Sequence, residues 1–144
     1  MAHYEVTIPT ALSPQEAFDR LAAVERFVEW DPGVTSAEQV EGDGPGVGSA
    51  YVLKVKSFVG SDLALTYKTT AFDAPNRFVI VADEKSLRSD DVITVVPDGD
   101  GCRVTYAADL EMKGAFALMN PLLGLVFNRI GDKAAAGMRQ FLDA

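Results

Sequence analysis

Residues 112–133 read MKGAFALMNPLLGLVFNRIGDK, and no charged side chain lies between Lys113 and Arg129. Such a stretch could be a membrane anchor, an ordinary core helix, or the wall of a pocket for an apolar molecule. A membrane-spanning helix needs about 20 mostly apolar residues. The charge-free run covers only fifteen positions and includes Asn120, Pro121 and two glycines. We therefore predict no transmembrane segment here.

From this stretch onward, apolar residues recur at spacings of three and four, which predicts one long amphipathic helix. They are Met119, Leu122, Leu123, Val126, Phe127, Ile130, Ala134, Met138 and Phe141. A proline deep inside a helix costs about 3 kcal/mol, so we place Pro121 in the first turn, with Asn120 as N-cap and a short apolar turn at 114–119 before it. Leu118 and Leu125 fall off the face that Met119, Leu122, Val126 and Phe127 define. This second side could meet the short helices, a cavity entrance or another subunit.

Upstream of the helix, turn signals divide the chain into six predicted strands. Their bounds are 34–41, 49–58, 62–72, 77–83, 87–96 and 102–112. Residues 3–9 alternate between apolar and polar side chains and predict one more strand. Ser13, Pro14 and Glu16 form a helix-start signal, followed by two short helices that end before the turn Asp31-Pro32-Gly33. This order predicts an α+β fold in which an antiparallel sheet curls around the last helix.

Composition limits the classes of function. The 144 residues are 48% hydrophobic and 24% charged, which predicts a single domain over residues 1–144. The net charge of -8, with scattered lysines and arginines, argues against a nucleic-acid partner. Cys102 is the only cysteine, so an internal disulfide and a multi-thiolate metal site are excluded. With no signal-peptide pattern at the N-terminus, we predict a cytoplasmic protein.

Four stretches resemble the START-like or SRPBCC superfamily, and within it the polyketide cyclase/dehydratase-like branch. They are SPQEAFDRLAAVERFVEWDPGV at 13–34, GVGSAY at 46–51, LTYKTTAFDAPNRFVIVA at 65–82 and DVITVVPDGDGCRVTYAADLEMKG at 91–114. The resemblance implies a helix-grip fold, in which a seven-stranded antiparallel sheet wraps around the long C-terminal helix and leaves a cavity between them. This superfamily includes cyclases, dehydratases, hydrolases, carriers and hormone receptors, so the fold alone does not select a function.

Alternation along the strands predicts which side chains face the cavity. The candidate ligand-binding residues are Trp30, Tyr51, Leu53, Leu65, Tyr67, Asp91, Ile93, Tyr106, Leu110, Met119, Leu123 and Phe127. A desolvated Asp91 beside tyrosine hydroxyls could donate to a ligand carbonyl or protonate an enolate, which makes Asp91 and Tyr106 the candidate catalytic residues. In the alternative interpretation, Asp91 is solvated near a strand end and the tyrosines are core aromatics.

Other chemical features are weaker. His3 is the only histidine and lies near the terminus, and Cys102 follows a hairpin turn without a histidine partner, so no metal site, cofactor or nucleophile is predicted. The run GDGPGVGS at 42–49 lacks the Lys-Ser/Thr pair and the following helix of a phosphate loop. We predict that it is a loop at the rim of the pocket.

These features together predict a protein that binds a small, largely apolar molecule, polyketide-, lipid- or quinone-like, between the sheet and the last helix. One alternative is a cyclase or dehydratase that uses the same cavity. A second is a lipid or quinone chaperone that docks on a membrane or a partner protein. The apolar C-terminal helix could also form a homodimer contact.

Overall fold

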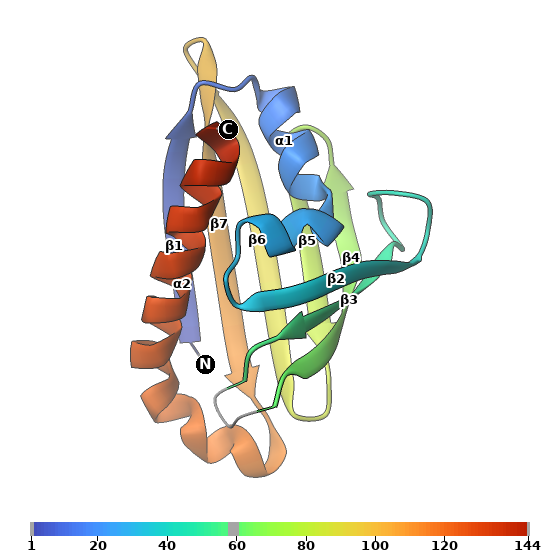
Figure 1. The fold of residues 1–144 in the computed structure, drawn as a ribbon, viewed down its shortest axis with the longest axis vertical. Coiled ribbons are helices and arrows are strands. Elements are labelled where there is room, and N and C mark those ends of the chain that lie inside the picture. The colour runs from blue at the N-terminus through green and yellow to red at the C-terminus, as the bar shows by residue number, and fades with distance from the viewer. Residues whose placement is uncertain (1, 58–60, 144) are drawn as a thin grey trace.

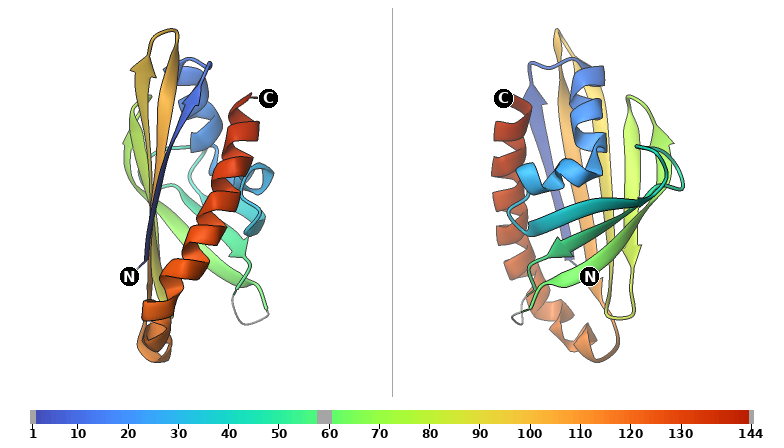
Figure 2. Two further views of the ribbon diagram at one scale, coloured as in Figure 1. Left: turned by 90° about the vertical axis from the view of Figure 1, so that its left-hand side faces the viewer. Right: turned by 45° about the vertical axis from the view of Figure 1, so that its right-hand side comes forward.

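The computed structural model describes residues 2–57 and 61–143. The elements follow in the order β1 (Ala2–Thr10), α1 (Pro14–Ala22), η1 (Val24–Glu29), β2 (Val34–Glu41), β3 (Ala50–Val55), β4 (Leu63–Asp73), β5 (Arg77–Asp83), β6 (Leu87–Asp98), β7 (Gly101–Met112), η2 (Gly114–Met119) and α2 (Asn120–Asp143). Over these ranges, seven antiparallel strands form one sheet in the order β1-β7-β6-β5-β4-β3-β2. The sheet curves around α2, while α1 and η1 cover another part of the same face (Figures 1 and 2). The predicted helix-grip fold is confirmed.

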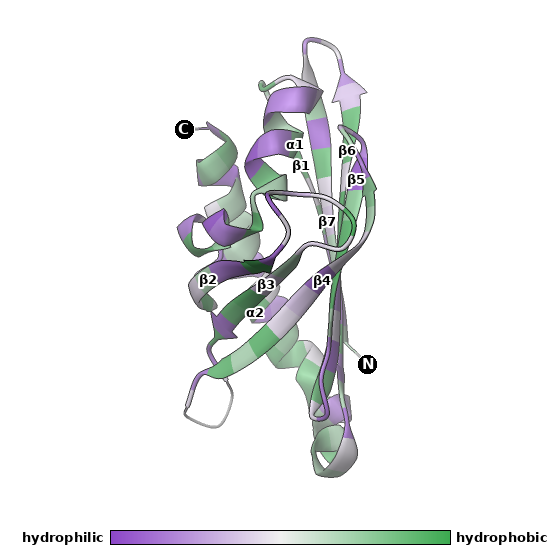
Figure 3. Ribbon diagram, turned by 90° about the vertical axis from the view of Figure 1, so that its right-hand side faces the viewer, coloured by the Kyte–Doolittle hydropathy of each residue, from purple (hydrophilic) through white to green (hydrophobic). Residues whose placement is uncertain are grey.

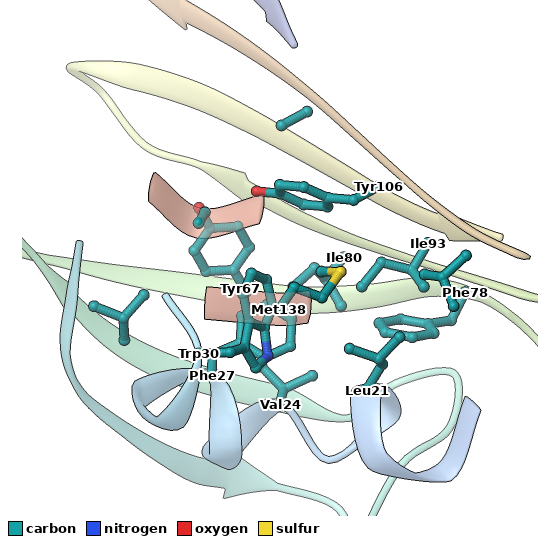
Figure 4. Packing of buried hydrophobic residues seen from close by; sticks show 14 of the residues in the cluster. Leu21, Val24, Phe27, Trp30, Tyr67, Phe78, Ile80, Ile93, Tyr106 and Met138 are labelled. Carbon is teal, nitrogen blue, oxygen red and sulfur yellow. The ribbon is translucent and has the colours of Figure 1, made fainter. Parts of the chain in front are cut away.

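The short N-terminal helices close one end of the sheet. The Ser13 hydroxyl caps α1 by accepting a hydrogen bond from the Glu16 amide at 3.2 Å. Phe18 of α1 then packs edge-on against the rings of Phe72 and Phe78, with centroids 5.3 and 5.6 Å apart. Figure 4 shows part of the surrounding core, with Leu21 of α1 beside Phe78. These contacts fill the space between α1 and the sheet, beside the C-terminal end of α2 (Figure 1).

The strand β5 could not be oriented from its sequence, because it is apolar on both faces. In the structure, Phe78, Ile80 and Ala82 are at most 2% exposed and belong to the core. Val79, on the other face, is also buried. Val81, on the same outer face as Val79, is partly exposed, so the inner face of β5 is the more completely buried one.

Two glycines allow the C-terminal part of α2 to approach the rest of the molecule closely. A Cβ atom at Gly137 would overlap the backbone carbonyl of Trp30, and one at Gly131 would overlap the ring of Tyr4. The Tyr4 hydroxyl also donates to Asp132 at 2.9 Å. Near the end of the helix, an Arg20 side-chain nitrogen donates to the Phe141 carbonyl at 3.0 Å. The C-terminal half of α2 therefore packs closely against the rest of the molecule at positions where only glycine fits.

The start of α2 differs from the sequence prediction. Asn120 is not an N-cap, because its own backbone is helical, with φ -53° and ψ -42°. Its side-chain amide instead accepts from the Met112 N–H at 3.0 Å and donates to the Met112 carbonyl at 3.1 Å. The helix η2 runs directly into α2, so this amide ties the start of α2 to the end of β7.

The buried face of α2 also differs from the prediction. Leu123 is 3% exposed, whereas Leu122 is 72% exposed and Val126 is 42% exposed, so these two residues were wrongly placed on the buried face. Leu118 and Leu125 are 88% and 77% exposed, off the buried face as predicted. Figure 3 shows the hydrophobic colouring that continues along η2 and the start of α2. Among the described residues, no helix is long and apolar enough to span a membrane.

Candidate ligand-binding cavity

A cavity of about 260 Å³ lies between the inner face of the sheet and α2. Its wall is mostly apolar and is formed by β3, β4, β6, β7, α2 and the segment that follows η1. Seven of the residues predicted to bind a ligand line it: Leu53, Leu65, Tyr67, Asp91, Tyr106, Leu110 and Phe127. The alternation of the strands brings these residues together, because each strand contributes every second side chain to the concave face.

One part of the wall carries a group of polar side chains, which we call the polar end: Tyr67, Ser89, Asp91 and Tyr106. The Tyr67 hydroxyl donates to the Ser89 hydroxyl at 3.0 Å, and Ser89 donates to an Asp91 carboxylate oxygen at 3.5 Å. In Figure 4 the hydroxyl oxygens of Tyr67 and Tyr106 lie on the same side of the apolar cluster. A small polar group of a ligand would find both donors and acceptors here.

Burial controls the ionisation of the polar end. Asp91 is only 8% exposed, and this desolvation, with the nearby charge of Asp31, raises the pKa of Asp91 to about 7. Hydrogen bonding from Ser89 and from Tyr106 acts in the opposite direction. Burial also raises the pKa values of the Tyr67 and Tyr106 hydroxyls, so both remain protonated and able to donate. At neutral pH, Asp91 can therefore either donate or accept a hydrogen bond.

The alternative interpretation of Asp91 as a solvated residue near a strand end is wrong. Asp91 lies inside β6, opposite Ile80 of β5 and Ala108 of β7. The neighbouring Asp31 is half-buried; burial raises its pKa, while a hydrogen bond from the Gly33 amide at 2.9 Å lowers it. Two carboxyl groups thus share one weakly hydrated region.

Asp91→Asn should remove much of the dependence of stability on pH between about pH 4 and pH 7. The ordinary pKa of 3.8 rises to about 7 on folding, so in this window the folded protein holds a proton that the unfolded chain has lost. The free energy of unfolding of the wild type should therefore fall by roughly 1.4 kcal/mol per pH unit as the pH rises, and level off above about pH 7. Asp31, shifted in the same direction, leaves a residual slope in the variant.

Urea denaturation at several pH values measures this effect. The difference in free energy of unfolding between Asp91→Asn and the wild type should shift by about 4 kcal/mol in favour of the variant from pH 4 to pH 8. Asp43→Asn, which removes an exposed carboxylate in the loop between β2 and β3, is the control. Parallel stability profiles for the wild type and Asp91→Asn would show that the carboxyl is not desolvated.

Five predicted ligand-binding residues do not line the cavity: Trp30, Tyr51, Ile93, Met119 and Leu123. Trp30 packs behind the wall, with its ring centroid 4.7 Å from that of Phe27 and 5.7 Å from that of Tyr106. Ile93 and Tyr51 are fully buried in the core. Alternation predicts which face of a strand a residue is on, but not how much of that face the cavity occupies. This is why Ile93 and Tyr51 were placed in the wall.

Several residues of the wall were not predicted. Ser89 could have been found, because it lies two positions before Asp91 on the same face. Asp31 was interpreted only as a turn residue, and Lys133 carried no signal for a pocket. Strict alternation along β3 would place Lys56 with Lys54 on the outer face, but β3 ends at Val55 and Lys56 lines the cavity.

The glycine-rich loop at 42–49 is not at the rim of the cavity, contrary to the prediction. It joins β2 to the start of β3, whereas the cavity is lined from the other end of β3. The loop is held by hydrogen bonds to β4 and within itself: the Gly48 amide donates to the Thr69 carbonyl of β4 at 3.2 Å, and the Ser49 hydroxyl donates to the Gly44 carbonyl at 2.6 Å.

His3 and Cys102 lie away from the cavity. His3 is exposed, and hydrogen bonding to Asp109, with 2.7 Å between Nδ1 and the carboxylate oxygen, raises its pKa. Cys102 is 1% exposed, and burial raises the pKa of its thiol, which disfavours the nucleophilic thiolate.

A curved seven-stranded sheet that grips a long C-terminal helix around an apolar cavity defines the START-like helix-grip class. The chain belongs to the family described as "Polyketide cyclase / dehydrase and lipid transport", whose model matches residues 1–144. A search of curated protein sequences found no match.

Three solved structures illustrate the shared fold. A START superfamily protein from Mycobacterium smegmatis has a TM-score of 0.80 at 14% identity, covering 99% of this chain and 97% of that one. A STAR-related lipid transfer protein from Xanthomonas axonopodis has a TM-score of 0.74 at 17% identity, covering 97% and 85%. The di-domain aromatase/cyclase StfQ of the steffimycin biosynthetic pathway has a TM-score of 0.71 at 11% identity, covering 98% of this chain and 50% of that one.

Proposed function

We propose that this protein binds a small, largely apolar molecule, polyketide-, lipid- or quinone-like, in the cavity between the sheet and α2. The supporting observation is a mostly apolar wall with a compact, buried polar end. Burial of apolar ligand surface supplies affinity at roughly 25 cal/mol per Å², while Asp91 and Tyr106 orient one polar group. The volume lies just below the range of about 300 to 1,000 Å³ that is usual for ligand pockets, which favours a compact ligand. The family description also includes lipid transport.

Two experiments test this binding. Native mass spectrometry of the purified protein should detect a co-extracted apolar molecule. Independently, the neutral quinone menadione should bind with micromolar affinity in a calorimetric titration at pH 6, where Asp91 is mostly protonated. If no co-extracted molecule is found and menadione does not bind, the proposal is contradicted.

Asp91→Leu and Tyr106→Phe should each weaken menadione binding by about threefold to tenfold, the usual effect of one lost hydrogen bond. Tyr4→Phe and Asp43→Leu are matched controls, because they make the same substitutions outside the cavity wall. Calorimetry at pH 6 gives the affinities. If both cavity variants keep the wild-type affinity, the polar end does not contact the ligand.

An enzyme of the cyclase or dehydratase type is the second candidate. The observation that favours it is a buried carboxyl with a pKa of about 7 beside the Tyr106 hydroxyl, since a general acid or base works best near the ambient pH. Exchange of the α-hydrogens of an enolisable ketone with deuterated water, followed by NMR, tests it. The wild type should accelerate exchange and Asp91→Asn should not; equal rates in both would contradict catalysis by Asp91.

A lipid or quinone chaperone that docks on a membrane is the third candidate. Its supporting observation is the exposed apolar surface formed by Phe116, Leu118, Leu122, Leu125 and Val126 on η2 and the start of α2. Co-flotation with phosphatidylcholine vesicles that is lost on replacing Leu118, Leu122 and Leu125 by serine would support docking. The cytoplasmic location stays a prediction from the sequence alone.

A further inference from the structure

Two lysines line the same cavity and lie on different elements. Lys56 follows the end of β3, and Lys133 lies on α2. Both are exposed, in contrast to the buried Ser89 and Asp91 of the polar end. We call the exposed part of the wall that carries these two lysines the cavity mouth. The exposed part of the wall thus carries two cations, and the buried part carries Asp91. The half-buried Asp31 also lines the wall, two residues before Gly33, whose carbonyl accepts from the Lys56 amide at 2.9 Å.

The two ammonium groups are available to a ligand. Among the described residues, neither lysine has a carboxylate within ion-pair distance, whereas Lys113 pairs with Asp83 and Arg88 pairs with Asp90. Lysine side chains also bury their methylene stems against apolar surface while the charge stays in water. Lys56 and Lys133 can thus extend the apolar wall and present two cations where it meets solvent.

The charges dictate the direction in which a charged amphiphile would enter. An anionic group at the buried end would meet Asp91 and the nearby Asp31 in a weakly hydrated region, where repulsion between like charges is strong. The same group at the mouth would meet two cations instead. The net charge of -8 provides no general attraction for anions, so a preference for them has to come from these local contacts.

We propose that the cavity takes an anionic amphiphile, with the apolar body inside the cavity and a carboxylate or phosphate held between Lys56 and Lys133. This inference rests on the proposed function, because it presupposes that an apolar body occupies the cavity. It adds the chemical class of the ligand and its orientation.

Calorimetric titration at pH 8 and low salt with decanol, decanoate and decyl phosphate tests the proposal. Decanoate or decyl phosphate should bind about tenfold more tightly than decanol, with each exposed lysine contributing about threefold. The double variant Lys56→Gln and Lys133→Gln should remove this advantage, while decanol, which carries no anionic group, should lose much less affinity than the two anions. Raising the salt concentration should also reduce the advantage.

The matched control is the double variant Lys54→Gln and Arg129→Gln, which removes the same charge from β3 and α2 at positions outside the cavity wall. It should keep the preference for the anions. Failure of all three probes to bind would contradict the proposed function itself. Binding of decanol without tighter binding of either anion would overturn only the inference about the mouth, as would an anion preference that survives in the Lys56 and Lys133 variant. A preference for decanoate alone indicates a carboxylate, and one for decyl phosphate alone indicates a phosphate.

Discussion

Gly137→Ala is expected to destabilise the protein by about 3 kcal/mol. In an isolated helix this change would be favourable by about 1 kcal/mol, because alanine is the better helix former. Here a Cβ atom would overlap the Trp30 carbonyl, and a backbone atom cannot move away as the end of a flexible side chain can. The steric cost should exceed the gain in helix propensity, because the C-terminal half of α2 would have to move away from the segment that follows η1. Urea denaturation monitored by far-UV circular dichroism measures the loss.

Gly124→Ala is the matched control for this prediction. Gly124 lies in the same helix, and a Cβ atom there would have nothing within 4 Å. This substitution should therefore be neutral or stabilise the protein by up to about 1 kcal/mol. If the two substitutions had the same effect, the close packing of α2 on the Trp30 backbone would be contradicted.

Ala108→Phe should weaken the binding of menadione by more than about tenfold, because the aromatic ring would occupy the space that the ligand needs. Ala108 is 3% exposed, lies on β7 opposite Asp91, and lines the cavity. The cavity of about 260 Å³ offers room for a phenyl ring, so the variant should still fold. Calorimetry with menadione, alongside denaturation curves for both proteins, measures the two effects separately.

Ala107→Phe controls for the added aromatic ring. Ala107 lies one position earlier on β7, so its side chain points to the other face of the sheet, and this variant should bind menadione as the wild type does. Undiminished binding by a folded Ala108→Phe protein would place the ligand elsewhere.

The strands could be predicted from the sequence because a period of two is strong wherever one face of a sheet is buried. The inward set Val104, Tyr106 and Ala108 on β7 follows directly from this rule. The start of α2 could not be predicted as well, since its apolar residues surround the helix and leave no polar face to orient it. Leu122 and Leu123 were both predicted to face inward, and only Leu123 does. The side-chain amide of Asn120 binds the Met112 backbone at the end of β7, a contact that the rules for helix capping do not predict.

In the candidate site, too, local patterns predict some residues, and tertiary contacts decide the others. The inward orientation of Asp91 followed from alternation, and its burial follows from the elements around it. Asp31 raises the pKa of Asp91 only because the turn after η1 returns to the sheet, which is a tertiary contact that no local pattern contains. Lys56 could not be predicted as a wall residue either, because it lies beyond the last paired position of β3 and no longer follows the alternation of that strand.

A crystal structure of the protein with menadione tests the central claim most directly. We predict that the quinone lies between β7 and α2, with one carbonyl oxygen within hydrogen-bond distance of Asp91 or Tyr106. An interior that is closed beneath α2, or a quinone found only outside the cavity, would contradict the proposed function.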